Sequence, residues 1–145
     1  MASSSRLFRP ISSIARSGAV APRAFTSRPF STTVPNLVVK NIQSAQEYNE
    51  VVKAATKPIL IDCFATWCGP CKAISPILEK LSDDPALSGK IDFVKIDVDE
   101  LPDVSGELGI RAMPTFIIIK DGVKADQLVG ANPPALLEML QKHAA

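Results

Sequence analysis

The sequence predicts a single α/β domain with a central mixed β-sheet of about five strands, flanked by about four helices. Three observations support this fold class. Short apolar runs alternate with segments of helical period throughout residues 36–145. The runs at 58–65 and 91–99 are almost continuously apolar, which is typical of central strands that are covered on both faces. An Asp-Gly pair at 121–122 separates two later runs and predicts an antiparallel hairpin.

Local signals place the boundaries of these elements. Ser44 and Glu47 fit a capping box, in which each side chain satisfies a free amide at a helix start. Pro76 lies inside the second helical segment and should bend it, because proline cannot donate a backbone hydrogen bond. Pro133 suits the first turn of the last helix. The expected order is strand 37–41, helix 44–55, strand 58–65, helix 71–83, strand 91–99, helix 101–109, strands 115–122 and 123–130, and helix 133–144.

The first thirty residues differ in composition from the rest of the chain. They contain five arginines and many serines, and the first acidic residue is Glu47. The whole chain has 16 basic and 15 acidic side chains, so residues 31–145 keep 11 basic ones and carry a formal charge of −4. An Arg-rich, Ser-rich segment without acids predicts a cleavable organellar transit peptide over 1–30 and a folded domain over 31–145.

A basic tail that binds nucleic acid is the alternative for this segment, but its arginines are spaced and form no dense block. The stretch RPFST (28–32) resembles the site that the mitochondrial processing peptidase cuts, with Arg before an aromatic residue and a serine. The sequence therefore predicts a protein of the mitochondrial matrix, with a chloroplast address as the alternative. We expect no nucleic-acid partner and, because no apolar run is long enough to span a bilayer, no membrane association.

Cys68 and Cys71 stand two residues apart and could act as a metal clamp, a structural staple or a reactive dithiol. A zinc site needs four ligands, yet the only other cysteine is Cys63 and the only histidine is His143. We therefore expect no metal. A staple across two residues closes a very short loop and stabilises little. A stable disulfide is also uncommon in the reducing interior of an organelle or the cytosol.

A reactive dithiol explains the neighbouring residues best. Cys68 follows a central strand and opens a helix, where free amides and the helix dipole stabilise a thiolate. Cys71 lies one turn into that helix and should be the more buried thiol, so it should stay protonated until it reacts. Gly69 permits the tight turn and Pro70 restricts it. The two sulfurs should lie within bonding reach, so the pair can open and close with little backbone movement.

Four segments resemble the thioredoxin family in order and spacing: DCFATWCGPCK (62–72), KIDVDE (95–100), RAMPTF (111–116) and LVGAN (128–132). Such a set covers nearly all of the predicted domain and is far more specific than a lone C-x-x-C. Gly-Pro between the cysteines is typical of the reducing members, whereas protein disulfide isomerases usually carry Gly-His. The resemblance implies a thioredoxin fold and a thiol–disulfide oxidoreductase that reduces the disulfides of client proteins.

The resemblance also implies a role for each reactive residue. Cys68 would attack a client disulfide, and Cys71 would resolve the mixed disulfide and leave a Cys68–Cys71 disulfide. Asp62 would be the buried carboxylate that accepts and returns the proton of Cys71, because burial raises the pKa of a carboxyl group. Lys95 looks like its charge partner. The alternatives are an Asp62 that is bonded to backbone for structural reasons and a Lys95 that is exposed at a strand edge.

A docking face for the client is implied as well. Pro114 resembles the family's cis-proline, which faces the cysteine pair and leaves the backbone of Met113 free to pair with an extended client segment. Gly130 would keep this face open, although it could be only a turn residue. The predicted face consists of Trp67, Gly69, Pro70, Met113, Pro114, Gly130 and Ala131.

Two positions depart from the family pattern. Phe64 stands where some members have a second Trp, which is a common substitution. Cys63 is less usual. Its place in an apolar strand predicts that it packs as a small hydrophobic residue, and a third redox thiol is the alternative.

The resemblance implies partners but no bound cofactor. Electrons should come from NADPH through a flavin-containing thioredoxin reductase and pass to clients such as peroxiredoxins and methionine sulfoxide reductases. A potential of about −270 mV is typical of the family, whereas an oxidising or isomerising relative would lie nearer to about −180 mV. The domain should be a monomer. A thioredoxin-fold binding or chaperone subunit, which would act without its cysteines, is the alternative function.

Overall fold

The structure, a computed structural model, describes residues 39–145 of the chain. The predicted transit peptide and the first residues of the predicted domain lie outside this range. None of the described helices is long and apolar enough to cross a bilayer. The elements are β1 (Val39–Ile42), α1 (Ala45–Ala54), β2 (Ile59–Phe64), α2 (Gly69–Asp83), β3 (Asp92–Asp97), α3 (Pro102–Leu108), β4 (Thr115–Lys120), β5 (Val123–Val129) and α4 (Pro133–His143).

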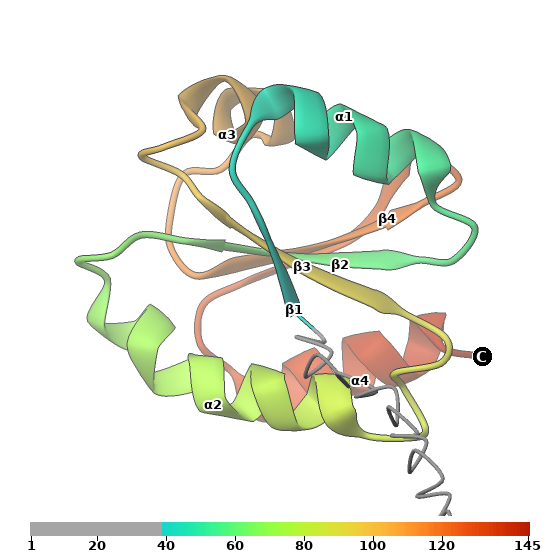
Figure 1. Cartoon of the computed structure of the whole chain (residues 1–145). Coiled ribbons are helices and arrows are strands. Elements are labelled where there is room, and N and C mark those ends of the chain that lie inside the picture. Colours follow the sequence, from blue (N-terminus) through green and yellow to red (C-terminus); the bar gives the residue numbers. More distant parts are fainter. Residues whose placement is uncertain (1–38) are drawn as a thin grey trace, which may run out of the picture. The chain divides into compact units, whose positions relative to one another are not determined.

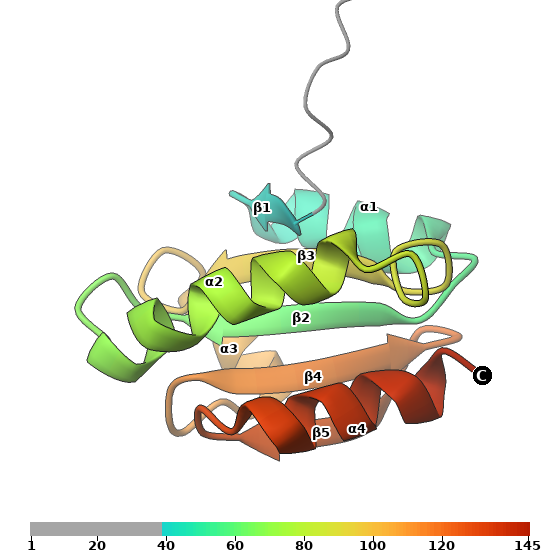
Figure 2. The ribbon, with the colours of Figure 1, turned by 90° about the horizontal axis from the view of Figure 1, so that it is seen from below.

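The five strands form one mixed sheet in the order β1-β3-β2-β4-β5. β3 pairs in parallel with both β1 and β2, whereas β4 pairs antiparallel with β2 and with β5. Helices α1 and α3 cover one face of the sheet, and α2 and α4 cover the other (Figures 1 and 2). The predicted five-stranded mixed sheet with four helices is therefore confirmed.

β2 lies in the middle of the sheet and contributes to the core on both faces. Ile61 packs on the side of α1 and α3, and Leu60 packs on the side of α2 and α4; both are fully buried. Burying one such side chain stabilises the fold by about 1.5–3 kcal/mol. The almost continuous apolar run that predicted a central strand is explained by this two-sided burial.

The helix starts differ slightly from the sequence-based expectation. α2 begins at Gly69 rather than at residue 71, because Gly69 and Pro70 form its first turn, where the missing proline N–H needs no partner. At α1, Ser44 Oγ accepts a hydrogen bond from the Glu47 amide at 3.1 Å, as predicted. The return bond is different: Glu47 Oε2 accepts from the amide of Gln43, at 2.9 Å, instead of from Ser44. Only half of the predicted capping box forms.

The predicted hairpin joins β4 and β5. Asp121 and Gly122 have φ angles of 54° and 75°, which is the pair of positive values that a two-residue hairpin turn of the mirror-image type requires. The turn sends β5 back along β4 and brings Gly130, which follows β5, next to Pro114, which precedes β4. The hairpin thus assembles one side of the site from residues sixteen positions apart.

Candidate active site

Cys68 lies at the junction of β2 and α2, at the N-cap of the helix. Its amide donates to the Ala65 carbonyl at 3.1 Å, and its Sγ accepts from the Cys71 amide at 3.2 Å. Cys68 and Cys71 form a disulfide, with 5.3 Å between their Cα atoms. The geometry fits the predicted redox pair, because a sulfur that accepts a helix N-terminal amide is well placed to carry negative charge when the bond is reduced.

Both cysteines of the pair are buried. Cys68 is 4% exposed and Cys71 is 6% exposed, so the prediction that Cys71 is the more buried one is wrong for this disulfide form. The two exposures are nearly equal because the bonded sulfurs lie side by side. What separates the two cysteines is their surroundings: Cys68 caps the helix, whereas Cys71 lines a pocket that reaches Asp62.

Asp62 is a buried carboxylic acid without a hydrogen bond at its Oδ1 atom, and it is 5% exposed. Burial raises its pKa from 3.8 to about 7, although the positive charge of Lys95 acts in the opposite direction. The alternative of a carboxylate held by backbone donors does not fit an unpartnered oxygen. A carboxyl group that changes its protonation state near neutral pH suits the transfer of a proton.

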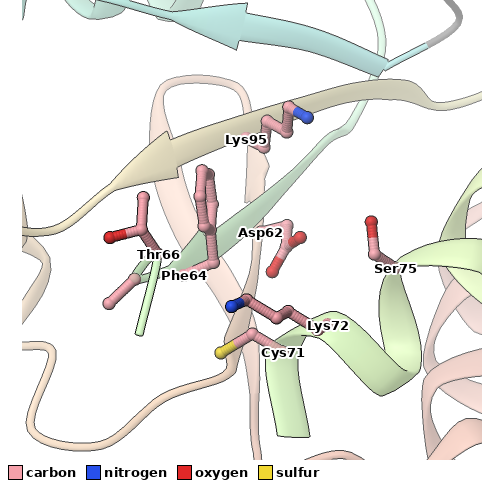
Figure 3. Close-up of a pocket in the computed structure, with 8 residues that line it drawn as sticks. Asp62, Phe64, Thr66, Cys71, Lys72, Ser75 and Lys95 are labelled. Carbon is pink, nitrogen blue, oxygen red and sulfur yellow. The ribbon is translucent and has the colours of Figure 1, made fainter. Parts of the chain in front are cut away.

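Asp62 opens into a pocket of about 320 Å³ between the sheet and α2. Figure 3 shows Asp62 of β2 below Lys95 of β3, with Cys71, Lys72 and Ser75 of α2 on the other side. The Asp62 carboxyl group and Cys71 thus share one small space. The pocket is lined by Asp62, Phe64, Ala65, Thr66, Cys71, Lys72, Ser75 and Lys95.

Lys95 stands directly opposite Asp62 in the register of β2 and β3. β3 runs between β1 and β2, and Lys95 is half-buried, so the alternative of an exposed strand-edge lysine is wrong. Its ammonium group lies 5.7 Å from the centre of the Phe64 ring and makes no direct ion pair with Asp62 within the described residues. Lys95 therefore acts on Asp62 through its field rather than through a salt bridge.

Cys63 points to the opposite face of the sheet, into the core under α1 and α3. It is a fully buried free thiol, and burial together with the neighbouring Asp62 raises its pKa well above the usual range. Such a thiol stays protonated and inert, which fits the predicted role as a small hydrophobic residue.

The predicted docking residues gather around the disulfide. Trp67 is 67% exposed, and Met113 packs against the cluster formed by Ala65 and the two cysteines. The peptide bond between Met113 and Pro114 is cis. The Pro114 carbonyl accepts from the Gly130 amide at 2.8 Å, which ties the two loops together. Gly69, Pro70 and Ala131 are exposed beside them.

Gly130 has a φ angle of 96°, a conformation that residues with a side chain rarely adopt. A Cβ atom added there would meet no other atom within 4 Å and would point into open space beside Pro114. The backbone conformation thus favours glycine at this turn, and the space beside it is open. That a side chain here would block a client stays a prediction.

Several residues of the site escaped the sequence-based prediction. Lys72 and Ser75 line the pocket with Cys71, and the four-residue spacing of Cys71 and Ser75 on one helix was a signal for Ser75. Asp99, whose Oδ2 accepts a 2.8 Å hydrogen bond from the Trp67 indole, lies 32 positions away along the chain. No local pattern predicts that contact.

Within residues 39–145 no group of three or more His, Cys, Asp and Glu side chains could hold a metal ion. His143 lies 3.1 Å from Asp126 Oδ2 through its Nε2 atom, so it pairs with β5 rather than with a cysteine. The zinc clamp therefore has no support in the described part of the chain.

A Cys-Gly-Pro-Cys disulfide at a helix start, with a buried acid in the pocket that Cys71 lines, is the kind of site that thiol–disulfide oxidoreductases use. The family model for thioredoxin matches residues 38–142. A thioredoxin from Aspergillus fumigatus is 50% identical over 107 residues, which cover 74% of this chain and 96% of that protein. The chain therefore belongs to the thioredoxin family, and it is a protein-disulfide oxidoreductase that works through its Cys-Gly-Pro-Cys motif.

Solved structures of the family agree with the fold. The thioredoxin of Malassezia sympodialis has a TM-score of 0.70 and 47% identity, covering 74% of this chain and 91% of that chain. Mitochondrial thioredoxin 3 of Saccharomyces cerevisiae, in its oxidised form, has a TM-score of 0.66 and 38% identity, covering 72% and 94%. The fold of this chain is thus that of a thioredoxin.

Proposed function

We propose that this chain is a mitochondrial thioredoxin in which Cys68 attacks client disulfides, Cys71 resolves the mixed disulfide and Asp62 handles the proton. One observation carries the assignment of roles. The Cys68 sulfur accepts a hydrogen bond from the Cys71 amide in the first turn of α2, whereas Cys71 shares a pocket with Asp62, whose Oδ1 atom has no hydrogen-bond partner. The surroundings of Cys68 therefore favour a thiolate, whereas those of Cys71 favour the transfer of its proton.

In the first step the Cys68 thiolate attacks one sulfur of the client disulfide. A bond forms between Cys68 Sγ and that sulfur, the client's own sulfur–sulfur bond breaks, and the second client sulfur leaves as a thiolate that takes up a proton. The mixed disulfide holds the client on the docking face.

In the second step Cys71 gives its proton to Asp62 and attacks Cys68 Sγ. The new bond between the two cysteines releases the first client sulfur as a thiolate. The client has gained two electrons, and the protein holds the disulfide seen in the structure. A pKa of about 7 for Asp62 lets the same group accept the proton and return it when the pair is reduced again. The field of Lys95 keeps that pKa from rising further.

The docking face has seven members: Trp67, Gly69, Pro70, Met113, Pro114, Gly130 and Ala131. An extended client segment would lie along the loop before β4 and pair with the Met113 backbone, as in β-strand addition. The half-buried Met113 and the open space at Gly130 support this route, because both lie next to the disulfide or to Pro114.

Electrons would come from a flavin-containing thioredoxin reductase that uses NADPH, and this chain itself would need no bound cofactor, since two thiols carry both electrons. Peroxiredoxins and methionine sulfoxide reductases are the clients we propose. A similar solved structure comes from work on how a yeast mitochondrial 1-Cys peroxiredoxin is resolved through glutathione and thioredoxin systems. The domain would work as a monomer.

The proposed address is the mitochondrial matrix, with residues 1–30 as the transit peptide and 31–145 as the mature domain. The basic, acid-free composition of residues 1–30 supports it. The similar proteins include both organelles: one similar structure is a yeast mitochondrial thioredoxin, and one relative is thioredoxin M4, chloroplastic, of Arabidopsis thaliana. Import of the full chain into isolated mitochondria, followed by N-terminal sequencing of the product, would test both the address and the cleavage site.

The reaction is tested by insulin reduction with residues 31–145, NADPH and thioredoxin reductase. We expect turnover with the wild type and none with Cys68→Ser or Cys71→Ser. Only the Cys71→Ser protein should trap a mixed disulfide with the client, because its Cys68 still attacks but nothing resolves the product. Trapping by Cys68→Ser instead would reverse the roles of the two cysteines.

The same experiment separates the reductase from a binding or chaperone subunit. A binding protein would keep its effect on a client when both cysteines are serine. Absence of turnover in a correctly folded wild type would contradict the reductase proposal outright.

A further inference from the structure

Trp67 is the single tryptophan of the chain, and among residues 39–145 it is the most exposed large hydrophobic side chain, at 67%. An indole this exposed is held by little packing. Its Nε1 atom nevertheless donates a 2.8 Å hydrogen bond to Asp99 Oδ2. The ring is therefore anchored on one side by a carboxylate from another loop, next to the reactive disulfide.

Asp99 lies in the turn after β3, and this turn is itself fixed. Asp97, the last residue of β3, is 4% exposed, and its Oδ1 accepts from the Asp99 amide at 2.9 Å. The Asp97 carbonyl accepts from the Leu101 amide at 3.0 Å. The amide of Val98 donates to the Phe64 carbonyl at 2.9 Å. A short side chain that binds the backbone two residues on is a known way to lock a turn.

These contacts form a continuous connection from the core to the surface: buried Asp97, then the backbone of Asp99, then its carboxylate, then the indole of Trp67. Neither Asp99 nor Trp67 is needed to fill the core, because both are exposed. The outer part of the connection, from the Asp99 carboxylate to the Trp67 indole, therefore adds nothing to the core, and it lies beside the disulfide where the proposed docking face begins.

We propose that Asp99 is a positioning residue for client docking, which holds the Trp67 ring in its docking orientation, and that Asp97 holds Asp99. The inference rests on the proposed function, in which Trp67 belongs to the docking face. A ring that is already oriented loses less conformational freedom when a client binds, and ordering one side chain costs an interface about 0.5–1.5 kcal/mol, which corresponds to a change of about two- to tenfold in affinity.

The test is a single-turnover oxidation of the pre-reduced protein by excess insulin, which leaves out the reductase. Asp99→Ala removes the acceptor, and we expect the half-saturating insulin concentration to rise about two- to tenfold while the maximal rate stays unchanged. Asp99→Asn keeps an oxygen that can accept from the indole, so it should recover most of the loss. Glu100→Ala removes a neighbouring exposed charge and should resemble the wild type.

Two further readouts separate positioning from a general structural effect. The reaction of each reduced variant with a small aromatic disulfide needs no docking face and should proceed at the wild-type rate. The fluorescence anisotropy of Trp67, unambiguous because the chain has one tryptophan, should fall in Asp99→Ala and return in Asp99→Asn. The pair Asp97→Ala and Asp97→Asn should repeat this pattern. If Asp97→Ala does not fold, the Asp99 variants still decide, since Asp99 is on the surface.

Trp67→Ala distinguishes the two proposals. If Trp67→Ala weakens insulin binding while Asp99→Ala leaves both the half-saturating concentration and the anisotropy unchanged, the role of Asp99 is overturned and the docking face stands. If Trp67→Ala has no effect either, the docking face itself is wrong. A parallel loss in Asp99→Ala and Glu100→Ala would mean a charge effect and would also overturn the positioning role.

Discussion

Two neighbours in β2, Asp62 and Cys63, point to opposite faces of the same sheet and lie in different surroundings. Cys63 lies in a closed apolar core under α1 and α3. Asp62 lies on the face of α2 and α4, where a pocket of about 320 Å³ leads to Cys71. Burial raises the pKa of both groups. Only the pKa of Asp62 lies near neutral pH in the folded protein, because the ordinary pKa of a carboxyl group is acidic, whereas that of a thiol is already above neutral.

The difference shows how one strand supports both stability and chemistry. The closed face stabilises the fold and gives its thiol neither a solvent path nor a proton partner. On the other face, α2 leaves a pocket beneath its first turn, and this pocket holds both the buried acid Asp62 and Cys71. Reactivity in this protein therefore follows from which face a side chain points to, more than from residue type alone.

The largest expected effect comes from Ile117→Ala on the closed face. Ile117 is fully buried opposite Ile61, and truncating such a side chain costs about 2–5 kcal/mol of unfolding free energy. Ile118→Ala, its neighbour on the other face, should cost about as much, because both positions are fully buried in apolar clusters. Urea unfolding of the oxidised proteins measures both. A much smaller loss for Ile118 would mean that the face with the pocket is loosely packed throughout.

A smaller effect, of the opposite sign, is expected from Asp62→Asn. The pKa of Asp62 is raised from 3.8 in the unfolded chain to about 7, so the folded protein binds the proton more tightly and loses stability as pH rises between these values. Since one pKa unit corresponds to about 1.4 kcal/mol, the wild type should lose about 3 kcal/mol between pH 5 and pH 8 through this group. The variant should lack this loss and be the more stable protein at pH 8.

The same substitution should slow the resolving step. Without the carboxylate, Cys71 has lost its base, and the mixed disulfide should break down about tenfold more slowly or worse, with solvent in the pocket providing a poorer acceptor. Rapid mixing with insulin, acid quenching and detection of the mixed disulfide would measure it. An unchanged lifetime at neutral pH would remove Asp62 from the mechanism, even if its effect on stability is found.

The sequence was sufficient for the fold and for the cysteine pair. Continuous apolar runs placed β2 and β3, and the Asp-Gly pair placed the hairpin, because these signals are local. The cysteine pair was found for the same reason, since it lies within one strand–turn–helix segment. Asp62 was singled out through the family resemblance, and the structure places it in the pocket that Cys71 lines.

What the sequence did not predict depends on contacts between distant segments. The 2.8 Å bond from Trp67 to Asp99 joins residues 32 positions apart, and nothing in either segment points to the other. Lys95 was expected to be the charge partner of Asp62, and its charge does act to lower the pKa of Asp62, but the position of its ammonium group over the Phe64 ring was not predicted. A long flexible side chain has several partners within reach, and only the packed structure selects one.

The smallest effect is expected at Cys63, and it tests the closed face most directly. Cys63→Ala removes one buried sulfur and should cost about 1 kcal/mol without changing insulin reduction. In the reduced, folded wild type, iodoacetamide at neutral pH should modify Cys68 and leave Cys63 intact, because burial keeps that thiol protonated and out of reach. Peptide mapping after unfolding, with a second label for the protected thiols, reads out both sites. Labelling of Cys63 in the folded protein would mean that the closed face opens, and would favour a third redox thiol over a core residue.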